Sequence, residues 1–291
     1  MHLIVGATGF VGGMAARQLR GRGRDVRALV RGGVGHPGAA ALEQAGVSIA
    51  TGDLGDAAAV TEACNGVETV VCTATSMPAA GGDALQRVDH DGVLGLIAAA
   101  ERAGVRRFVY TSFSGNLDFD SQLTRAKRAC EARLAASRMD SVVLRPSCFM
   151  EVWLGPHLGF DAAGAKARIF GDGTAGISYI SARDVAAFAF AAATAPGTLR
   201  DVVQIGGPEP ISQLGVVAIF ERALGRRFSL EFVPIAALEA QHQSPDPLQQ
   251  TFAALMLGCA LGDAIPEARQ NAARYGVALA SVEEYAAGVR Q

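Results

Sequence analysis

Three glycines near the start of the chain have the spacing of a turn that binds phosphates. Gly6, Gly9 and Gly12 repeat at three-residue intervals after an apolar run from His2 to Val5. In a strand–turn–helix unit, such glycines permit a tight turn, close approach of the backbone to a pyrophosphate and close helix packing. The helix N-terminus adds free N–H groups and the positive end of its dipole. We therefore expect a dinucleotide at this turn; because the chain has 35 glycines, a loop that only packs tightly is the alternative.

Lysine is rare in this chain, which makes one lysine a candidate for chemistry. Lys127 and Lys166 are the two lysines among 26 basic residues, and the rest are arginine. A lysine in an arginine-rich chain suggests a task that arginine does not perform, such as giving up a proton or fitting between ribose hydroxyls. Lys127 lies on a helix expected over residues 122–137. We expect it to belong to the site; an ordinary surface lysine is the alternative.

The residue at the end of the second expected strand favours one of the two nicotinamide cofactors. NAD-binding units place an Asp or Glu about 20 residues after the glycines, where it binds the ribose hydroxyls. Here Arg31 stands nineteen residues after Gly12. A guanidinium pairs with a 2′-phosphate, which a carboxylate would repel. We therefore expect NADP(H) rather than NAD(H), with a solvated arginine as the alternative.

An alternation of strands and helices must position these residues. Runs such as Val70, Val71 and Cys72 indicate strands that are buried on both faces. The expected strands cover residues 2–5, 25–31, 47–53, 68–74, 106–112 and 140–146, and the expected helices cover residues 14–19, 39–45, 57–64, 83–103 and 122–137. This pattern predicts an α/β fold with a doubly wound parallel sheet of the Rossmann type.

After Pro146 the alternation becomes less regular. We expect helices near residues 149–158, 182–193 and 213–224, strands at 167–171, 177–181, 202–206 and 228–234, and a mostly helical remainder. The prediction is a Rossmann domain over residues 1–147 and a smaller α+β substrate-binding cap over residues 148–291. Part of the cap, about residues 177–207, is expected to pack back on the sheet.

Composition limits the partners that the chain can have. Of its 291 residues 50% are apolar and 19% are charged, and the net charge is −2 without a basic stripe. We expect a small-molecule substrate rather than nucleic acid or membrane, and a monomer or homodimer. The apolar helical run at residues 185–195 is too short to span a bilayer.

The five cysteines form no C-x-x-C pair and lie mostly in apolar surroundings. We expect reduced, buried thiols in a cytoplasmic protein. Because the first expected strand begins at His2, we also expect no signal or transit peptide.

Four segments resemble the short-chain dehydrogenase/reductase superfamily, in its atypical NmrA-like and isoflavone-reductase-like branch. They are Gly-Ala-Thr-Gly-Phe-Val-Gly at residues 6–12, Val-Val-Leu-Arg-Pro at 142–146, Ile-Ser-Tyr-Ile-Ser-Ala-Arg-Asp-Val-Ala at 177–186 and Gly-Gly-Pro-Glu at 206–209. The resemblance extends from Met1 to about Arg227. Members of this branch are NADPH-dependent reductases of quinones and aromatic natural products, or NADP-binding regulatory proteins without turnover.

The resemblance implies catalytic roles, with one departure. The superfamily carries a Ser or Thr after the fifth strand and a Tyr-x-x-x-Lys on the next helix. Lys127 matches the lysine, but Leu123 occupies the tyrosine position, so the usual triad is incomplete. Lys127 is then expected to bind the nicotinamide ribose and to act as the general acid or base. Ser112 or Ser114 would bind the substrate oxygen; capping hydroxyls are an equal alternative.

The remaining site residues also follow from the resemblance and the expected strand ends. The cofactor is expected to contact Gly6, Thr8, Gly9, Phe10, Val11, Gly12, Arg31, Asp53, Leu54, Thr73, Ala74, Thr75, Lys127 and Pro146. An apolar pocket for the substrate is expected from Met77, Phe113, Phe149, Met150 and Trp153. Alternatives are a helix cap for Asp53 and ordinary core roles for the pocket residues. Tyr179 either supplies the missing phenol or packs in the core.

We expect no metal, because Asp89-His90-Asp91 lacks ligand spacing. The function expected is an NADPH-dependent reductase that transfers hydride to a quinone, carbonyl or conjugated double bond of a small aromatic substrate. The alternatives are an NADP(H)-sensing regulator and an epimerase- or cyclase-like enzyme without net NADPH consumption.

Overall fold

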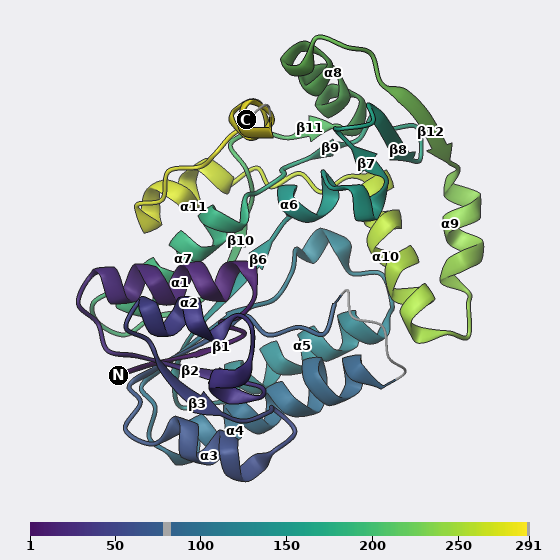
Figure 1. The fold of residues 1–291 in the computed structure, drawn as a ribbon. Helices are drawn as coiled ribbons and strands as arrows, with labels where there is room; N and C mark the ends of the chain where they lie inside the picture. Colours follow the sequence, from purple (N-terminus) through teal and green to yellow (C-terminus); the bar gives the residue numbers. More distant parts are fainter. Residues whose placement is uncertain (78–82, 290–291) are drawn as a thin grey trace. The chain divides into compact units, whose positions relative to one another are not determined.

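A seven-stranded sheet in the order β10-β6-β5-β4-β1-β2-β3 organises the chain (Figure 1). The computed structural model describes residues 1–77 and 83–289. The strands are β1 His2–Val5, β2 Val26–Val30, β3 Ser48–Thr51, β4 Thr69–Cys72, β5 Arg107–Thr111, β6 Asp140–Pro146 and β10 Arg200–Ile205. From β1 to β6 each neighbouring pair is parallel. This order confirms the predicted doubly wound Rossmann sheet.

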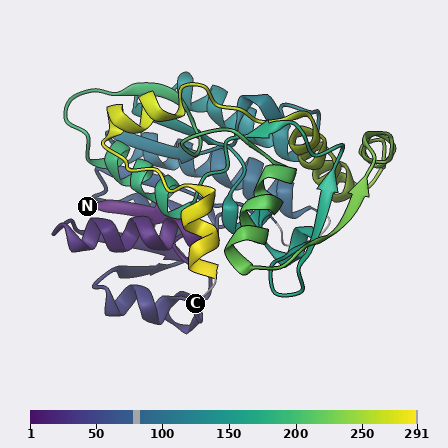
Figure 2. The ribbon, with the colours of Figure 1, turned by 90° about the horizontal axis from the view of Figure 1, so that it is seen from above.

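Helices cover both faces of this sheet, which explains why β1 is buried along its whole length. They are α1 Phe10–Gly21, α2 Ala39–Gln44, α3 Ala57–Cys64, α4 Val93–Arg102, α5 Gln122–Ala135 and α7 Ala182–Thr194. The side chains of Leu3 and Val5 pack in one core with residues of α3, α4 and α5. In Figures 1 and 2, α1 runs alongside β1. The alternation of β1 side chains thus supplies two apolar faces.

The chain forms two compact units, and each is drawn from several stretches. Unit 1 comprises Met1–Ser112, Arg125–Leu144 and Val185–Val203, and unit 2 comprises Phe113–Thr124, Arg145–Asp184 and Gln204–Gln291. The strand β10 therefore joins the main sheet although it comes late in the chain. The predicted division at residue 147 stays a prediction.

Unit 2 has two small sheets and a separate core. One sheet has the order β12-β8-β7 and the other pairs β11 with β9. Its elements are α6 Met150–Trp153, β7 Phe160–Asp161, β8 Lys166–Phe170, β9 Gly176–Ile177, β11 Ile211–Ser212, α8 Gln213–Leu224, β12 Ser229–Val233, α9 Ile235–His242, α10 Pro247–Leu261, α11 Ala268–Tyr275 and α12 Val282–Val289, with 3-10 turns η3 Gly115–Leu117 and η4 Pro156–Leu158. Phe160, Phe220 and Phe228 pack ring against ring in its core.

Two expected helices are divided in the structure. The helix expected over residues 83–103 consists of a π-helical segment, η2 Leu85–Gly92, followed directly by α4. The helix expected over residues 149–158 consists of α6 and η4. Leu154 and Gly155 lie between these two. The break is explained by Pro156, because a proline disfavours helical backbone at the residue before it and has no N–H to donate.

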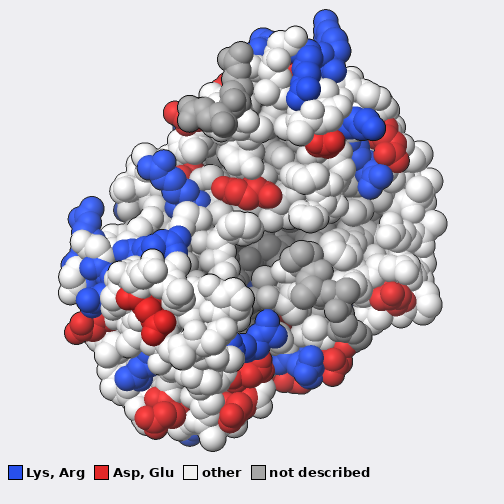
Figure 3. Space-filling model, viewed as in Figure 1, with Lys and Arg blue, Asp and Glu red and all other residues white. Residues whose placement is uncertain are grey.

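Surface and thiol properties complete the fold. Within residues 1–77 and 83–289, no helix has the length and apolar character needed to cross a membrane. The five cysteines are free and buried, as the sequence predicts. On the face drawn in Figure 3, basic and acidic side chains are interspersed.

Candidate cofactor and catalytic site

The turn after β1 accepts glycine alone at two positions. Gly6 has φ +90°, and a Cβ there would lie 2.7 Å from Thr73 Oγ1 and 2.8 Å from Ala74 N. A Cβ on Gly12 would lie 2.3 Å from Gly6 O. At Gly9 the nearest atom to such a Cβ is Gly6 O at 3.3 Å, so that position is less confined. The turn therefore brings α1 against the carboxyl ends of β1 and β4 with no room for side chains.

The N-terminus of α1 is open. Its N-cap is Gly9, no side chain within residues 1–77 and 83–289 caps it, and its first turn contains no acidic residue. Thr8, Gly9 and Phe10 are exposed. Because the first N–H groups of a helix have no partner within the helix, this end has the donors and the dipole that a phosphate requires.

Thr73 and its neighbours lie where the strand order reverses. Thr73 N donates to Val5 O at 2.9 Å, which ties the end of β4 to the end of β1. Ala74 is buried and Thr75 is exposed. Ligands of doubly wound sheets bind outside such a reversal point. Gly6, Gly12 and Thr73 are thus brought together, as expected for a dinucleotide site.

Arg31 and Asp53 form a loose pair at the ends of β2 and β3. Arg31 Nε lies 3.8 Å from Asp53 Oδ2, and the side chains are 76% and 49% exposed. Such an exposed pair contributes little to stability, so the guanidinium is available to another anion. The N-cap of α3 is Asp56, whose carboxylate accepts from Ala58 N and Ala59 N. Asp53 is therefore not that helix's cap. Leu54, the next residue, is half-buried.

Lys127 is buried at the carboxyl end of β5. Its side chain is 6% exposed, and Nζ donates to Thr111 O at 3.3 Å. Nζ also lies 3.6 Å from Asp89 Oδ1 and 5.1 Å from the centre of the Tyr110 ring. An ordinary surface lysine is thereby excluded. One turn earlier on α5, Leu123 is buried and offers no proton.

Asp89 is the residue that sequence reasoning missed. It is completely buried, and its Oδ2 accepts from Ser76 N at 2.8 Å and from Ser76 Oγ at 2.7 Å. A signal was present in the sequence, because Asp89 stands in the stripe Leu85, Asp89, Val93 and Leu96 at helical spacing. A lone carboxylate in an apolar stripe is informative, since buried acids need a partner.

The two candidate serines belong to different units. Ser112, in unit 1, accepts a hydrogen bond from Arg128 Nη1 at 3.0 Å. Ser114, in unit 2, donates to Asp263 Oδ1 at 2.6 Å and accepts from Asn116 N at 3.2 Å. The Ser114 hydroxyl is therefore engaged both with the distant Asp263 and with the turn that follows it. Ser112 remains the stronger candidate for a substrate contact.

Most expected pocket residues lie in unit 2, whereas Met77 lies in unit 1. Met150 is fully buried, and Trp153 packs edge-on against Phe170 with 6.1 Å between ring centres. Phe113 and Phe149 are half-buried, and Pro146 is buried. A cavity beside Trp153 has a volume of about 20 Å³, which suits one water rather than a substrate. The substrate pocket stays a prediction.

Tyr179 packs in the core of unit 2. It is 3% exposed, and burial raises the pKa of its phenol well above the usual value. The core alternative is therefore correct for this residue, and its phenol is not placed for proton transfer to a solvent-accessible substrate.

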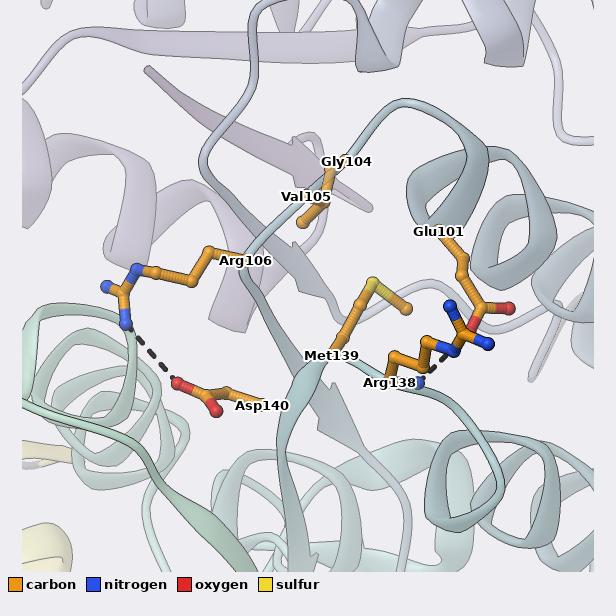
Figure 4. A pocket seen from close by; sticks show the side chains of 7 residues that line it. All are labelled: Glu101, Gly104, Val105, Arg106, Arg138, Met139 and Asp140. Atoms are coloured by element: carbon orange, nitrogen blue, oxygen red, sulfur yellow. Dashed lines mark hydrogen bonds and ion pairs between the residues drawn. The ribbon is translucent and has the colours of Figure 1, made fainter.

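A hollow of about 580 Å³ lies at the amino ends of β5 and β6, which is the other end of the parallel strands from the glycine turn (Figure 4). Its lining residues are Glu101, Gly104, Val105, Arg106, Arg138, Met139 and Asp140. Arg106 points toward Asp140 and pairs with it at 3.3 Å. Parallel strands place Gly6 and Thr73 at their other ends. This hollow is therefore separate from the candidate cofactor site.

Comparisons with known proteins bear on the family and the fold of this chain. Residues 2–285 match the sequence model of the NmrA-like family. A (4-alkanoyl-5-oxo-2,5-dihydrofuran-3-yl)methyl phosphate reductase of Streptomyces griseus is 33% identical over 87% of this chain and 84% of its own length. A photosystem II assembly factor of Synechocystis is 27% identical over 81% of this chain and 71% of its own. An NADPH-dependent quinone oxidoreductase of Escherichia coli, solved with NADPH, shares the fold with a TM-score of 0.80 and 23% identity, covering 100% of both chains.

Proposed function

Because this chain belongs to the NmrA-like family, we propose that it is an NADPH-dependent reductase of small molecules. The observation that supports this most directly is the buried ammonium of Lys127 at the carboxyl end of β5. The same unit contains the glycine turn and Arg31. A reduction by hydride transfer requires a bound nicotinamide and a source of protons. The glycine turn and Lys127 are the candidates for these two tasks, and both lie at the carboxyl ends of the strands.

The residues of unit 1 fit a bound NADPH. The confined backbone at Gly6 and Gly12 and the open end of α1 suit the pyrophosphate, with Thr8, Gly9, Phe10 and Val11 supplying N–H groups or contacts. Arg31 exchanges its loose contact with Asp53 for the 2′-phosphate. Leu54 and Thr73 to Thr75 are proposed to contact the adenosine and nicotinamide ends. Pro146, a residue of unit 2, is proposed as a further cofactor contact.

NADPH supplies the hydride, and the protein supplies the proton that balances the reduction. Lys127 contacts the nicotinamide ribose and donates that proton from Nζ, since Leu123 has none to give. Ser112, oriented by Arg128, hydrogen-bonds the substrate oxygen. Met77, Phe113, Phe149, Met150 and Trp153 are proposed to contact an apolar ring.

The relatives favour a conjugated acceptor as the substrate class. One is a reductase of an oxo-dihydrofuran phosphate, and another is a quinone oxidoreductase. In both kinds of compound a carbonyl withdraws electrons from a ring double bond, which makes the ring an acceptor of hydride. We infer that this chain reduces a quinone, carbonyl or conjugated double bond of a small ring compound.

Cofactor titration followed by an acceptor panel tests the proposal. NADPH and NADH are titrated by fluorescence, and quinones and cyclic enones are then added while NADPH absorbance is followed. We expect tight NADPH binding and oxidation by at least one acceptor, lost in Lys127→Ala and retained in Lys166→Ala. Lys166 is the exposed lysine and serves as the matched control. Turnover that survives in Lys127→Ala would refute the assigned role.

A regulatory role is the second candidate. It is favoured by Leu123 in place of the superfamily tyrosine and by the similarity to a photosystem II assembly factor. A regulator would bind NADPH tightly, oxidise none with any acceptor, and retain its partner in Lys127→Ala.

A further inference from the structure

We propose that Asp89 is the positioning residue of Lys127, holding the ammonium through Oδ1 while Ser76 holds the carboxylate through Oδ2. The inference rests on the proposed reductase function, since it assigns the residue that sets the geometry and charge of the proton donor. It adds a third side chain, Ser76, by which the loop after β4 joins the same arrangement.

The two oxygens of Asp89 are used differently. Oδ2 accepts two hydrogen bonds from Ser76, at 2.8 Å from N and 2.7 Å from Oγ. Oδ1 has no hydrogen-bond partner within the described residues and lies 3.6 Å from Lys127 Nζ. The carboxylate is therefore fixed from one side, and it attracts the ammonium without a tight hydrogen bond. Lys127 can turn an N–H toward a ligand without losing its counter-charge.

The other side chains that face this ammonium are neutral. On β4, burial raises the pKa of Cys72 to about 12, and on α5 it raises that of Cys130 to about 11. On β5, burial raises the pKa of Tyr110 well above its usual value. At neutral pH these three groups keep their protons. Asp89, on η2, is thus the charged side chain that the described structure sets directly against Lys127.

The next charged residues of α5 balance each other. Arg128 and Glu131 form an ion pair, and Arg128 also donates to Ser112 Oγ. The charge of Arg128 thus lies against that of Glu131 on the same helix.

The backbone around Asp89 also suggests a functional role. Asp89 lies in η2, an eight-residue π-helical segment. The π-helix is rare and often occurs at functional sites.

A buried ion pair is weak support for stability, because apolar residues of similar size are often equally or more favourable. The pair is better explained by a requirement for charge at this place.

Ser76 connects the Lys127–Asp89 pair to the loop after β4, on the side of the sheet where the cofactor is proposed to bind. It lies three residues after Thr73, which binds the end of β1 and crowds Gly6. Because both Ser76 donors bind the same carboxylate oxygen, a shift of this loop moves Asp89, and with it the ammonium. Asp89 thereby couples the cofactor loop to the proton donor.

Lysine NMR tests this arrangement without any substrate. The chain has two lysines, so lysine labelled with ¹³C and ¹⁵N gives two ammonium signals, with exposed Lys166 as internal control. We expect Asp89→Asn to change the chemical shift of the Lys127 ammonium signal and to speed its hydrogen exchange with water, because the variant removes the carboxylate charge that lies 3.6 Å from Nζ. Asp91→Asn, an exposed neighbour, should leave both unchanged. Equal effects of the two variants would overturn the proposal.

Kinetics supply the second measurement. With an accepted substrate, Asp89→Asn should lower kcat by about tenfold to a hundredfold, a part of what a positioned proton donor contributes, with KM for NADPH changed less than about threefold. Asp89→Glu, which keeps the charge, should recover part of kcat. Ser76→Ala should have a smaller effect in the same direction.

The two proposals fail in different ways. If the wild-type protein oxidises no NADPH with any acceptor, the reductase function fails, and the lysine NMR comparison alone decides the role of Asp89. If turnover is found and Asp89→Asn retains full kcat while circular dichroism shows a folded protein, Asp89 is not a positioning residue. Failure of Asp89→Glu to exceed Asp89→Asn in kcat would contradict the assigned role of charge.

Discussion

At the scale of single residues, the proposed proton donor and its counter-charge are buried away from water. Lys127 and Asp89 have side chains that are 6% and 0% exposed, which makes their mutual attraction strong and the loss of either partner costly. Arg31 is the opposite case, since it is exposed and its contact with Asp53 is loose. Burial suits Lys127, which must keep its place and its charge. Exposure suits Arg31, which must exchange Asp53 for another anion.

Breaking and replacing the buried pair should have opposite effects on stability. Lys127→Met should lower the free energy of unfolding by about 3–5 kcal/mol, because it leaves Asp89 buried without a counter-charge. The double variant Lys127→Met with Asp89→Leu should regain most of that loss. Urea denaturation measures both, and a double variant less stable than the single one would contradict this account.

Replacing Arg31 should change the cofactor preference. Arg31→Ala removes a charge-assisted hydrogen bond worth about 1.5–3 kcal/mol, so NADPH affinity should fall about tenfold to a hundredfold. NADH affinity should change little, since NADH has no 2′-phosphate. Fluorescence titration of both cofactors measures this, with Asp53→Asn as a control that removes the competing carboxylate. An equal loss for both cofactors would mean that Arg31 does not contact the 2′-phosphate.

At the scale of elements, the glycine turn sets how α1 meets the sheet. Gly12 lies on α1, and its Cα faces Gly6 O so closely that a side chain would collide with backbone. Gly21, at the other end of α1, has open space around it. The same helix thus contains a glycine that packing requires and one that packing does not require.

These two glycines give a matched pair of substitutions. Gly12→Ala should destabilise the protein and abolish NADPH binding, because the methyl group must displace the β1 turn. Gly21→Ala should preserve binding and raise the free energy of unfolding by up to about 1 kcal/mol, the helix propensity gain. Thermal denaturation with NADPH titration compares them. Normal binding in Gly12→Ala would show that the turn adapts.

At the scale of the whole molecule, buried titratable groups report on global unfolding. All five cysteines are free and buried. Burial raises the pKa of Cys64 to about 11 and that of Cys72 to about 12. Because the thiolate is the reactive form, these groups are protected both by packing and by protonation.

Thiol labelling should therefore follow unfolding. In native protein at neutral pH, Ellman's reagent should react with none of the five cysteines on the time scale of minutes, and it should react with all five in denaturant. Spectrophotometric counting of released chromophore checks this. A thiol that reacts quickly without denaturant would reveal local opening around it.

His2 should add a pH dependence. Burial, followed by the nearby N-terminal amine, lowers the pKa of His2 below its ordinary 6.5. Below pH 6.5 the unfolded chain takes up a proton that the native state does not, so stability from this residue falls as pH falls through that value. Urea midpoints between pH 8 and 5 should fall less in His2→Val than in wild type. Exposed His157→Asn is the control, and equal slopes in all three proteins would contradict the assignment.

Much of the fold and part of the site follow from local sequence patterns. Strand–helix alternation predicted the doubly wound sheet, and the glycine spacing predicted the turn, because each depends on residues that are near one another in the chain. Lys127 was found through composition and family spacing. The division of the helix at residues 83–103 was not predicted, since a π-helical segment has no distinct pattern of residue types.

The sequence by itself determined the alternation, the buried strands, the glycine turn and the identity of Arg31 and Lys127 as candidates. The tertiary structure decided which side chains meet: that Asp89 of η2 faces Lys127 of α5, that Ser76 holds Asp89, and that Ser114 is engaged with Asp263. Periodicity specifies which face of an element is buried but leaves its partner open. Pairings between distant elements depend on how their faces pack together, and a single sequence does not record that packing.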